Sequence, residues 1–203
     1  MATLKDYFNL HPDGLSLQYL IDRFQLTNLI ETGAGRGETI EYCQPYFEKI
    51  FSIEIHPELV AWCESKFADN KNVLVFEGIL PGDLGVLLDL YPIKGNCMFF
   101  HDAHFPGADF HFAKYDSEKD YGRRLPLEGE LEIIKQKRDF KNDVFIIDDL
   151  WLYEDGPFQA GECTVAKELR GTGGADFIYK MFKKTHLVYK DYRWQGFLTI
   201  IPK

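Results

Sequence analysis

Long apolar runs are missing from this chain of 203 residues, and none reaches the roughly 18 residues that a membrane-spanning helix needs. Its first residues, Met1 to Tyr7, also lack the apolar core of a secretory signal peptide. Positive charge is scarce, because 23 Lys and Arg face 32 Asp and Glu, which gives a formal net charge of −9. Broad nucleic-acid binding needs a basic face. We therefore expect no membrane partner and no nucleic-acid partner.

Cysteine is sparse as well. The four cysteines, Cys43, Cys63, Cys97 and Cys163, lie far apart in the chain and form no Cys-x-x-Cys pair. This spacing argues against a zinc site and against a disulfide framework, and it favours buried thiols in a reducing compartment. We expect a cytoplasmic protein. The sequence leaves the oligomeric state open, with a homodimer as one possibility.

What the chain does contain is enough apolar material for a full core: 45% of its residues are hydrophobic and 15% are aromatic. No repeat, low-complexity tract or linker divides it, so we expect a single domain over residues 1–203. Residues 15–24, after the turn Pro12-Asp13-Gly14, place apolar side chains on one helical face. Residues 1–26 are thus predicted to form an N-terminal helical lid or packing segment.

Short apolar runs predict the strands of a sheet. The first five are residues 28–32, 49–55, 73–76, 97–101 and 144–147. They are nearly all apolar rather than alternating, which is typical of parallel strands covered by helices on both faces. Two last runs, 185–189 and 196–201, are joined by a short connection that favours antiparallel pairing at one edge. The predicted fold class is α/β: a Rossmann-like, doubly wound, mostly parallel seven-stranded sheet with an antiparallel edge strand and helices on both faces.

A glycine-rich turn follows the first apolar run, with the order Glu31-Thr32-Gly33-Ala34-Gly35-Arg36-Gly37. In an open α/β sheet, ligands bind beyond the carboxyl ends of the strands, at the point where the strand order reverses. Glycines at that point let the backbone approach a ligand closely. The dinucleotide motif needs its third glycine where this chain has Glu38. The turn predicts a ligand other than a dinucleotide, and a plain strand-to-helix turn is the alternative.

Two acidic residues beside this turn suit a cationic nucleoside. S-adenosylmethionine (SAM) has no phosphate, and its ammonium and sulfonium groups would be stabilised by a carboxylate such as Glu31. Glu54 ends the next apolar run, where its carboxylate would accept hydrogen bonds from ribose hydroxyls. Together with the turn, these residues make the stretch from about 29 to 150 resemble the class I SAM-dependent methyltransferases.

The resemblance rests on 31–37, on Ser52-Ile53-Glu54, on Glu77-Gly78-Ile79 and on Asp102 after the fourth apolar run. It implies SAM as the cofactor. The cofactor-binding residues that it implies are Glu31, Thr32, Gly33, Gly35, Gly37, Glu54, Ile55, Gly78, Ile79 and Asp102. Ile55 and Ile79 would flank the adenine. An acidic residue that usually stands beside the glycine of the third loop is absent here, with Asp83 coming only later, so the contact to the adenine amino group stays open.

Acidic residues also follow the fourth and fifth apolar runs. Asp102 and His104 follow the fourth, and Asp148 and Asp149 follow the fifth. Because these strands are expected to be neighbours, their ends should meet at the rim that holds the glycine turn. Converging carboxylates repel one another, and a hard divalent cation such as Mg²⁺ relieves that repulsion.

From this group we predict metal ligands at Asp102, Asp148 and Asp149, and catalytic roles for Asp102 and His104. His104 is the candidate general base, because the ordinary pKa of histidine lies near neutrality. Each residue also has a plainer interpretation. Asp148 can bond to backbone at a strand end, Asp149 can be solvated, and His104 can be structural.

One Asp after the fourth run and an Asp-Asp pair after the fifth resemble the macrocin-type, metal-dependent O-methyltransferases, which act on sugars of natural products. This chain has His104 where that family tends to have a second acidic residue, and the interval from Asp102 to Asp148 is longer. Part of the interval, residues 105–124, shows no clear period. We predict that it is a substrate loop, because loops of this length in compact domains are typically functional.

The sequence thus predicts a SAM-dependent O-methyltransferase that acts on a hydroxyl of a sugar or another small molecule, assisted by a divalent metal. Three alternatives remain: a metal-independent small-molecule methyltransferase, a non-catalytic SAM- or nucleotide-binding subunit and, last, an oxidoreductase.

Overall fold

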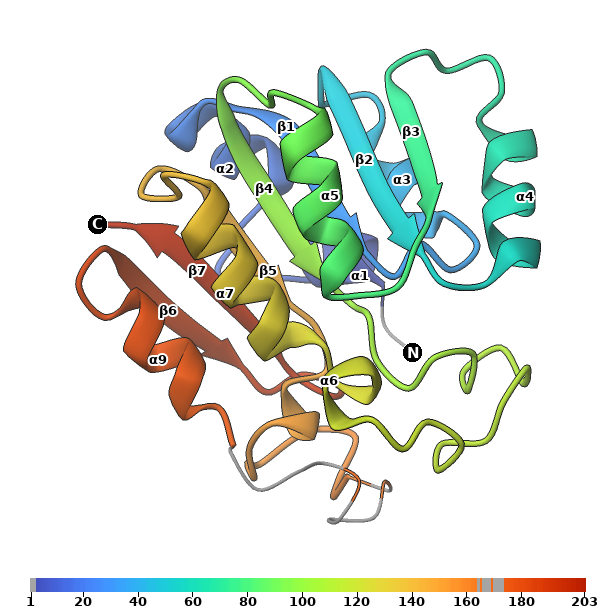
Figure 1. Ribbon diagram of the computed structural model, residues 1–203. Coiled ribbons are helices and arrows are strands. Elements are labelled where there is room, and N and C mark those ends of the chain that lie inside the picture. The colour runs from blue at the N-terminus through green and yellow to red at the C-terminus, as the bar shows by residue number, and fades with distance from the viewer. Residues whose placement is uncertain (1–2, 164, 166–168, 170–173) are drawn as a thin grey trace.

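A seven-stranded sheet forms the centre of the computed structural model, which describes residues 3–163, 165, 169 and 174–203 (Figure 1). Its strands are β1 (Leu26–Thr32), β2 (Lys49–Glu54), β3 (Val73–Glu77), β4 (Asn96–His101), β5 (Val144–Ile147), β6 (His186–Asp191) and β7 (Phe197–Pro202). They lie in the order β3-β2-β1-β4-β5-β7-β6.

Strands β1 to β5 run parallel, and β7 pairs antiparallel with both β5 and β6. The predicted fold class is therefore confirmed, and so is the expected pairing of β4 with β5. The reversed strand differs in detail from the prediction. It is β7, which lies one place inside the edge, and β6 is outermost.

Helices cover both faces of this sheet. They are α1 (Leu4–Asn9), α2 (Leu17–Phe24), α3 (Glu38–Cys43), α4 (Pro57–Lys66), α5 (Gly82–Leu90), α6 (Tyr121–Arg124), α7 (Leu127–Lys137) and α9 (Asp176–Phe182), with a 3₁₀ turn, η1 (Leu150–Leu152). Side chains of α5, α7 and α9 pack into one buried cluster, and side chains of α1 to α4 pack into the other. Figure 1 shows α5, α7 and α9 on the near face.

Local sequence explains where several helices begin and end. Pro57 occupies the first turn of α4, where its missing N–H costs no hydrogen bond. The α3 helix ends at Cys43, just before Pro45, because a proline further along would clash with the preceding turn. Ser16 caps α2 by accepting a hydrogen bond from the amide of Tyr19.

The segment expected to act as an N-terminal lid packs against the sheet through α1 and α2. Leu4, Tyr7 and Phe8 of α1 are buried, and the Tyr7 hydroxyl lies 2.5 Å from the hydroxyl of Thr199 on β7. A role as a lid stays a prediction. None of the helices in the described residues combines the length and the apolar character that a bilayer crossing requires.

Candidate functional site

A cavity of about 530 Å³ opens at the carboxyl ends of the central parallel strands. The strand order reverses here, because β1 lies between β2 and β4, and a ligand site is expected at such a point. The lining includes the glycine turn, the ends of β2 and β4, the residues after β5 and part of the loop that follows β4. Of the predicted site residues, those that line it are Glu31, Gly33, Gly35, Glu54, Ile55, Ile79, Asp102, His104, Asp148 and Asp149.

Three predicted cofactor residues are not among the lining residues. The Thr32 hydroxyl donates to Glu130 Oε2, 3.2 Å away, behind the cavity. A Cβ on Gly37 would lie 2.6 Å from a ring carbon of Phe67, so this glycine permits close packing on the C-cap residue of α4. Gly78 packs on the side chain of Asp83 in the same way. For these positions, a role in cofactor binding stays a prediction.

Glu54 ties the glycine turn to the end of β2. Its Oε2 accepts from the amide of Gly35 and its Oε1 accepts from the amide of His56, both at 2.9 Å. Gly35 adopts a left-handed φ of 51°, which brings its amide to the carboxylate. Because a carboxylate oxygen accepts more than one hydrogen bond, Glu54 can still accept from a ligand hydroxyl.

Glu31 is buried deeply, with 1% of its surface exposed. The Ser52 hydroxyl donates to its Oε2 at 2.5 Å. Burial raises the pKa of Glu31 to about 8, against the opposing effect of that hydrogen bond. At neutral pH the side chain is therefore mostly protonated, and a cation placed beside it in the cavity would favour its ionised form.

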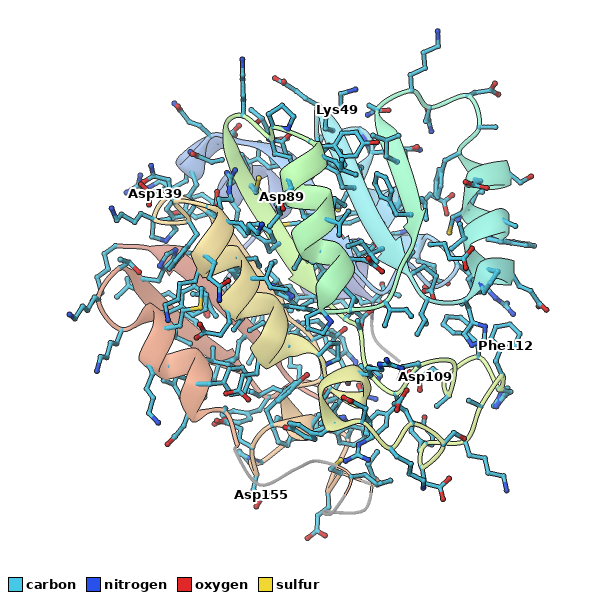
Figure 2. The ribbon with its side chains drawn as sticks, in the orientation of Figure 1. Lys49, Asp89, Asp109, Phe112, Asp139 and Asp155 are labelled. Atoms are coloured by element: carbon cyan, nitrogen blue, oxygen red, sulfur yellow. The ribbon has the colours of Figure 1, made fainter. Side chains whose placement is uncertain are left out.

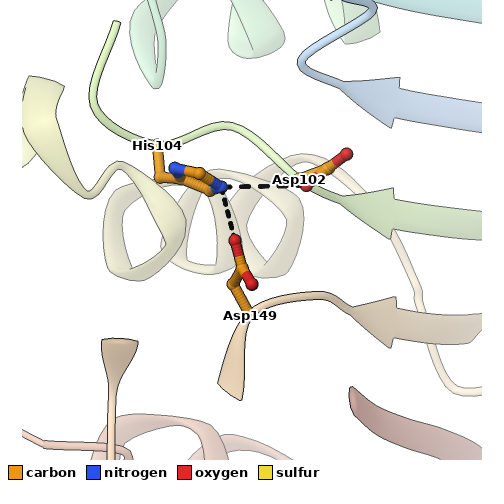
Figure 3. A group of neighbouring side chains, drawn as sticks. All are labelled: Asp102, His104 and Asp149. Carbon is orange, nitrogen blue, oxygen red and sulfur yellow. Dashed lines mark ion pairs between the residues drawn. The ribbon is translucent and has the colours of Figure 1, made fainter. Parts of the chain in front are cut away.

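The ends of β4 and β5 meet through His104 (Figure 3). Its Nε2 lies 2.7 Å from Asp149 Oδ2 and 3.9 Å from Asp102 Oδ1, and its Nδ1 lies 3.5 Å from Asp109 Oδ2. Burial lowers the pKa of His104. The hydrogen bond to Asp149 and the surrounding negative charge raise it by more, so that the pKa is about 9. In the absence of a ligand the ring is thus an imidazolium.

One oxygen of Asp102, one oxygen of Asp149 and a ring nitrogen of His104 all lie within 4.8 Å of one another. Burial raises the pKa of Asp102, and so does the negative charge of Asp149, while His104 lowers it. Two carboxylates and an imidazole are donors that divalent cations accept, so the residues present fit a metal. The group contains His104, which we had predicted as the base.

Asp148, a predicted metal ligand, lines the same cavity but lies outside this group. Its Oδ1 accepts from the amide of Asp149 at 2.7 Å. Burial raises its pKa well above the usual range, and the charge of Asp102 adds to that effect. Coordination by Asp148 stays a prediction.

Strained backbone borders the cavity. Three residues other than glycine have positive φ and line it: Phe105 at 39°, His111 at 63° and Asp149 at 52°. Such conformations are costly for side chains with a Cβ, and they concentrate at functional sites. The strained conformation of Phe105 is stabilised by the hydrogen bond from its amide to the carbonyl of Arg124, at 2.8 Å.

The loop 105–124 joins the two halves of the cavity. Phe110 lies on the glycine turn, because a Cβ on Gly35 would be 2.9 Å from its ring. Phe112 stacks on His56 with ring centroids 4.3 Å apart. Asp109, labelled with Phe112 in Figure 2, reaches His104 on the other side. No pattern in the sequence points to Asp109, since this stretch has no period that assigns directions to side chains.

Comparison with known proteins identifies the fold. No family model matches the chain, and no curated protein sequence matches it. The SAH-bound methyltransferase PaMTH1 of Podospora anserina is 16% identical with a TM-score of 0.57, covering 98% of this chain and 85% of its own. A Staphylococcus aureus protein, provisionally described as a caffeoyl-CoA O-methyltransferase, is 13% identical with a TM-score of 0.61, covering 100% and 85%.

A SAM-dependent methyltransferase of Aquifex aeolicus is 13% identical with a TM-score of 0.51, covering 91% of this chain and 87% of its own. At such low identity, structural similarity shows the fold alone. The protein therefore has the Rossmann-like fold of class I methyltransferases. Its activity has to be argued from the site.

Proposed function

We propose that this protein is a SAM-dependent O-methyltransferase that acts on a hydroxyl of a sugar or another small molecule, assisted by a divalent cation. One observation carries the proposal: the glycine turn with Glu31 and Glu54, and the group of Asp102, His104 and Asp149, line a single cavity. Methyl transfer is an in-line displacement, so donor and acceptor must be held side by side. The fold of the structural neighbours supports the same conclusion.

The cofactor half of the cavity would hold SAM, which supplies the methyl group. Glu54 would accept from the ribose hydroxyls, and Ile55 and Ile79 would contact the adenine. Glu31 would face the ammonium of the methionine part and regain its negative charge there. Gly33 and Gly35 leave the backbone of the turn open to the ligand.

The other half would place the acceptor. Asp102, Asp148 and Asp149 would hold a divalent cation, whose charge lowers the pKa of a bound hydroxyl. A positive charge at this point disfavours the imidazolium form of His104 and competes for its partner Asp149. His104 would then be neutral and could take the proton of the acceptor hydroxyl.

Calorimetry with S-adenosylhomocysteine (SAH) and with NAD⁺ tests the cofactor assignment. We expect SAH to bind and NAD⁺ not to bind. Glu54→Gln removes a charged acceptor and should weaken SAH binding at least about tenfold. Glu48→Gln is the matched control, because Glu48 is exposed and precedes β2 at the opposite end of that strand. Binding of NAD⁺ in place of SAH would overturn the proposal.

Methyl transfer without a metal is the second candidate. It is favoured by the surroundings of His104, whose Nε2 pairs with Asp149 at 2.7 Å and whose Nδ1 lies 3.5 Å from Asp109 without a hydrogen bond. Formation of SAH from SAM, followed with a panel of hydroxyl-bearing sugars, separates the two. Turnover that survives excess chelator would favour the metal-free reaction, and turnover lost on chelation and restored by Mg²⁺ would favour the metal. SAH binding without turnover on any acceptor would indicate a non-catalytic subunit.

A further inference from the structure

Glu130 is a buried carboxylate that does not line the cavity and has no part in the chemistry proposed above. It belongs to the first turns of α7, and 1% of its surface is exposed. Its Oε2 accepts from the Thr32 hydroxyl at 3.2 Å and lies 2.5 Å from His101 Nδ1. Thr32 ends β1 and His101 ends β4. One oxygen atom therefore joins the tips of two neighbouring strands.

The same two strand ends hold the acidic residues of the cavity through their backbones. The Thr32 carbonyl accepts from the amide of Asp102, and the His101 carbonyl accepts from the amide of Asp148, both at 3.0 Å. Each of these aspartates is thus one hydrogen bond away from a residue that Glu130 holds.

Gly129, next to Glu130 in the chain, lets α7 pack closely against the residues before α5. A Cβ on Gly129 would lie 2.5 Å from Pro81 Cγ, so α7 packs directly on the turn that carries Ile79 and Leu80. Both of these residues line the cavity. The His101 ring is fixed as well, because it stacks almost parallel to Phe145, with an angle of 2° between the planes. Glu130 and its partner therefore meet with little freedom to move.

Stability alone gives a poor account of this arrangement. Glu130 Oε1 and His101 Nε2 are buried without a hydrogen-bond partner in the described part of the chain. Unsatisfied buried polar atoms cost free energy, and apolar residues of similar volume often replace buried ionic pairs without loss of stability. A role outside the stability of the core would explain why a glutamate occupies this place.

We propose that Glu130 is a positioning residue that fixes the tips of β1 and β4 and thereby sets where Asp102 and Asp148 stand in the cavity. It acts through Thr32 and His101 and touches no ligand itself. The inference rests on the proposed function for what the two aspartates do. The bonds on which it depends are tested without cofactor, metal or acceptor.

Amide hydrogen exchange, followed by NMR in the full chain, measures these bonds directly. In Glu130→Leu, which fills a similar volume, the amides of Asp102 and Asp148 should lose at least about tenfold more protection than the amide of Met98 in the middle of β4. Glu130→Gln keeps an oxygen acceptor without the charge. It should show a smaller loss at the same two amides, and it tests the proposal if the leucine variant does not fold.

Asp143→Asn is the matched control. Asp143 is as deeply buried as Glu130, pairs with Arg138 and accepts from the amide of Cys97, at the opposite end of β4. In this variant the amide of Cys97 should lose protection from exchange, and the amides of Asp102 and Asp148 should lose no more protection than the amide of Met98. Equal losses at Asp102, Asp148 and Met98 in both Glu130 variants would overturn the proposal, because Glu130 would then be a core residue only.

Ligand affinities test whether the hydrogen bonds of Glu130 affect the metal half of the cavity. Calorimetry should give an SAH affinity for Glu130→Leu within about threefold of the wild type, because Glu130 touches the glycine turn only at Thr32, which does not line the cavity, and does not contact Glu54. Mn²⁺ affinity should fall at least about tenfold. A wild type that binds no Mn²⁺ would count against the metal in the proposed function. The exchange measurement would still decide the role of Glu130.

Discussion

His104 Nε2 and Asp149 Oδ2 lie 2.7 Å apart, and this contact connects the residues that follow β4 and β5 (Figure 3). With Asp109 on the other ring nitrogen and Asp102 nearby, the imidazole is surrounded by negative charge. The proton on His104 provides the positive charge that a bound cation would otherwise provide. Protonation, metal binding and stability should therefore be linked at this residue.

The stability of the ligand-free protein should decline as the pH rises above neutrality. The pKa of His104 is about 9 in the folded protein against an ordinary 6.5, so the folded state binds the additional proton. The resulting stabilisation is complete below pH 6.5, is lost as the pH rises through 9, and amounts to about 3 kcal/mol at most. The raised pKa of Glu31, about 8 against 4.5, acts in the same direction at lower pH.

Urea unfolding between pH 6 and 9.5 measures this effect. His104→Gln should abolish the part of the decline that lies above pH 8 and keep the part that Glu31 and Asp102, both with a pKa of about 8, contribute below it. A wild-type free energy of unfolding that stays constant over the whole range would contradict the prediction.

A divalent cation should compete with the proton on His104. Mn²⁺ binding, followed by electron paramagnetic resonance, should tighten as the pH rises from 7 to 9, because the imidazolium form of His104 repels a cation and metals bind ionised carboxylates. Asp149→Asn should weaken it at least about tenfold and leave SAH affinity nearly unchanged. Asp139→Asn, which alters an exposed carboxylate, serves as the control. Identical Mn²⁺ binding in the two variants would remove Asp149 from the metal site.

Much of the fold follows from local sequence. The apolar runs, Pro45 after α3 and Pro57 at the start of α4 depend on near neighbours. The strands, and the helix expected within 15–24, lie close to their expected positions. The rim shared by the glycine turn and the acidic residues was also predictable, because parallel strands end at the same edge. The position of β7 inside the edge was not, since either of the last two runs could pair with β5.

Side-chain directions and ionisation states needed the structure. The glycine pattern does not reveal that Gly37 accommodates Phe67 while Gly35 borders the cavity. The ordinary pKa of histidine suggests a base at neutral pH, whereas three carboxylates around the buried His104 ring hold it protonated. Asp109 belongs to no motif, and only the course of the loop turns it back onto His104.

Gly35→Ala should affect ligand binding more than stability. Any residue with a Cβ is strained at the φ of 51°, and the new methyl would also displace the Phe110 ring 2.9 Å away. Gly14→Ala is the matched control, because its φ is 70° and nothing lies within 4 Å of the added Cβ. We expect Gly14→Ala to lose about 1 kcal/mol in stability and Gly35→Ala to lose more, because of the displaced ring, and only Gly35→Ala to lose SAH affinity. Equal SAH affinities in the two variants would show that the contact between Gly35 and Phe110 does not matter for the ligand.

Glu31 should make cofactor binding depend on pH. Because its pKa is about 8 in the ligand-free protein, the carboxyl must lose its proton when a ligand ammonium binds beside it. SAH affinity should then increase between pH 6 and 7.5, by up to about tenfold per pH unit. The amino group of the ligand stands next to its own carboxylate, as in a free amino acid, and keeps its proton over this range, so the rise reports the protein side chain.

Two comparisons isolate Glu31 from other titrating groups. 5′-Methylthioadenosine lacks the amino-acid part of SAH, and its affinity should therefore stay constant over the same pH range. Glu31→Gln keeps an oxygen that can accept from the Ser52 hydroxyl, but it removes the titrating carboxyl group. SAH affinity should therefore become weaker and independent of pH. If the affinities of SAH and methylthioadenosine instead change in parallel with pH, the ammonium does not bind at Glu31, and the cofactor lies in the cavity in another orientation.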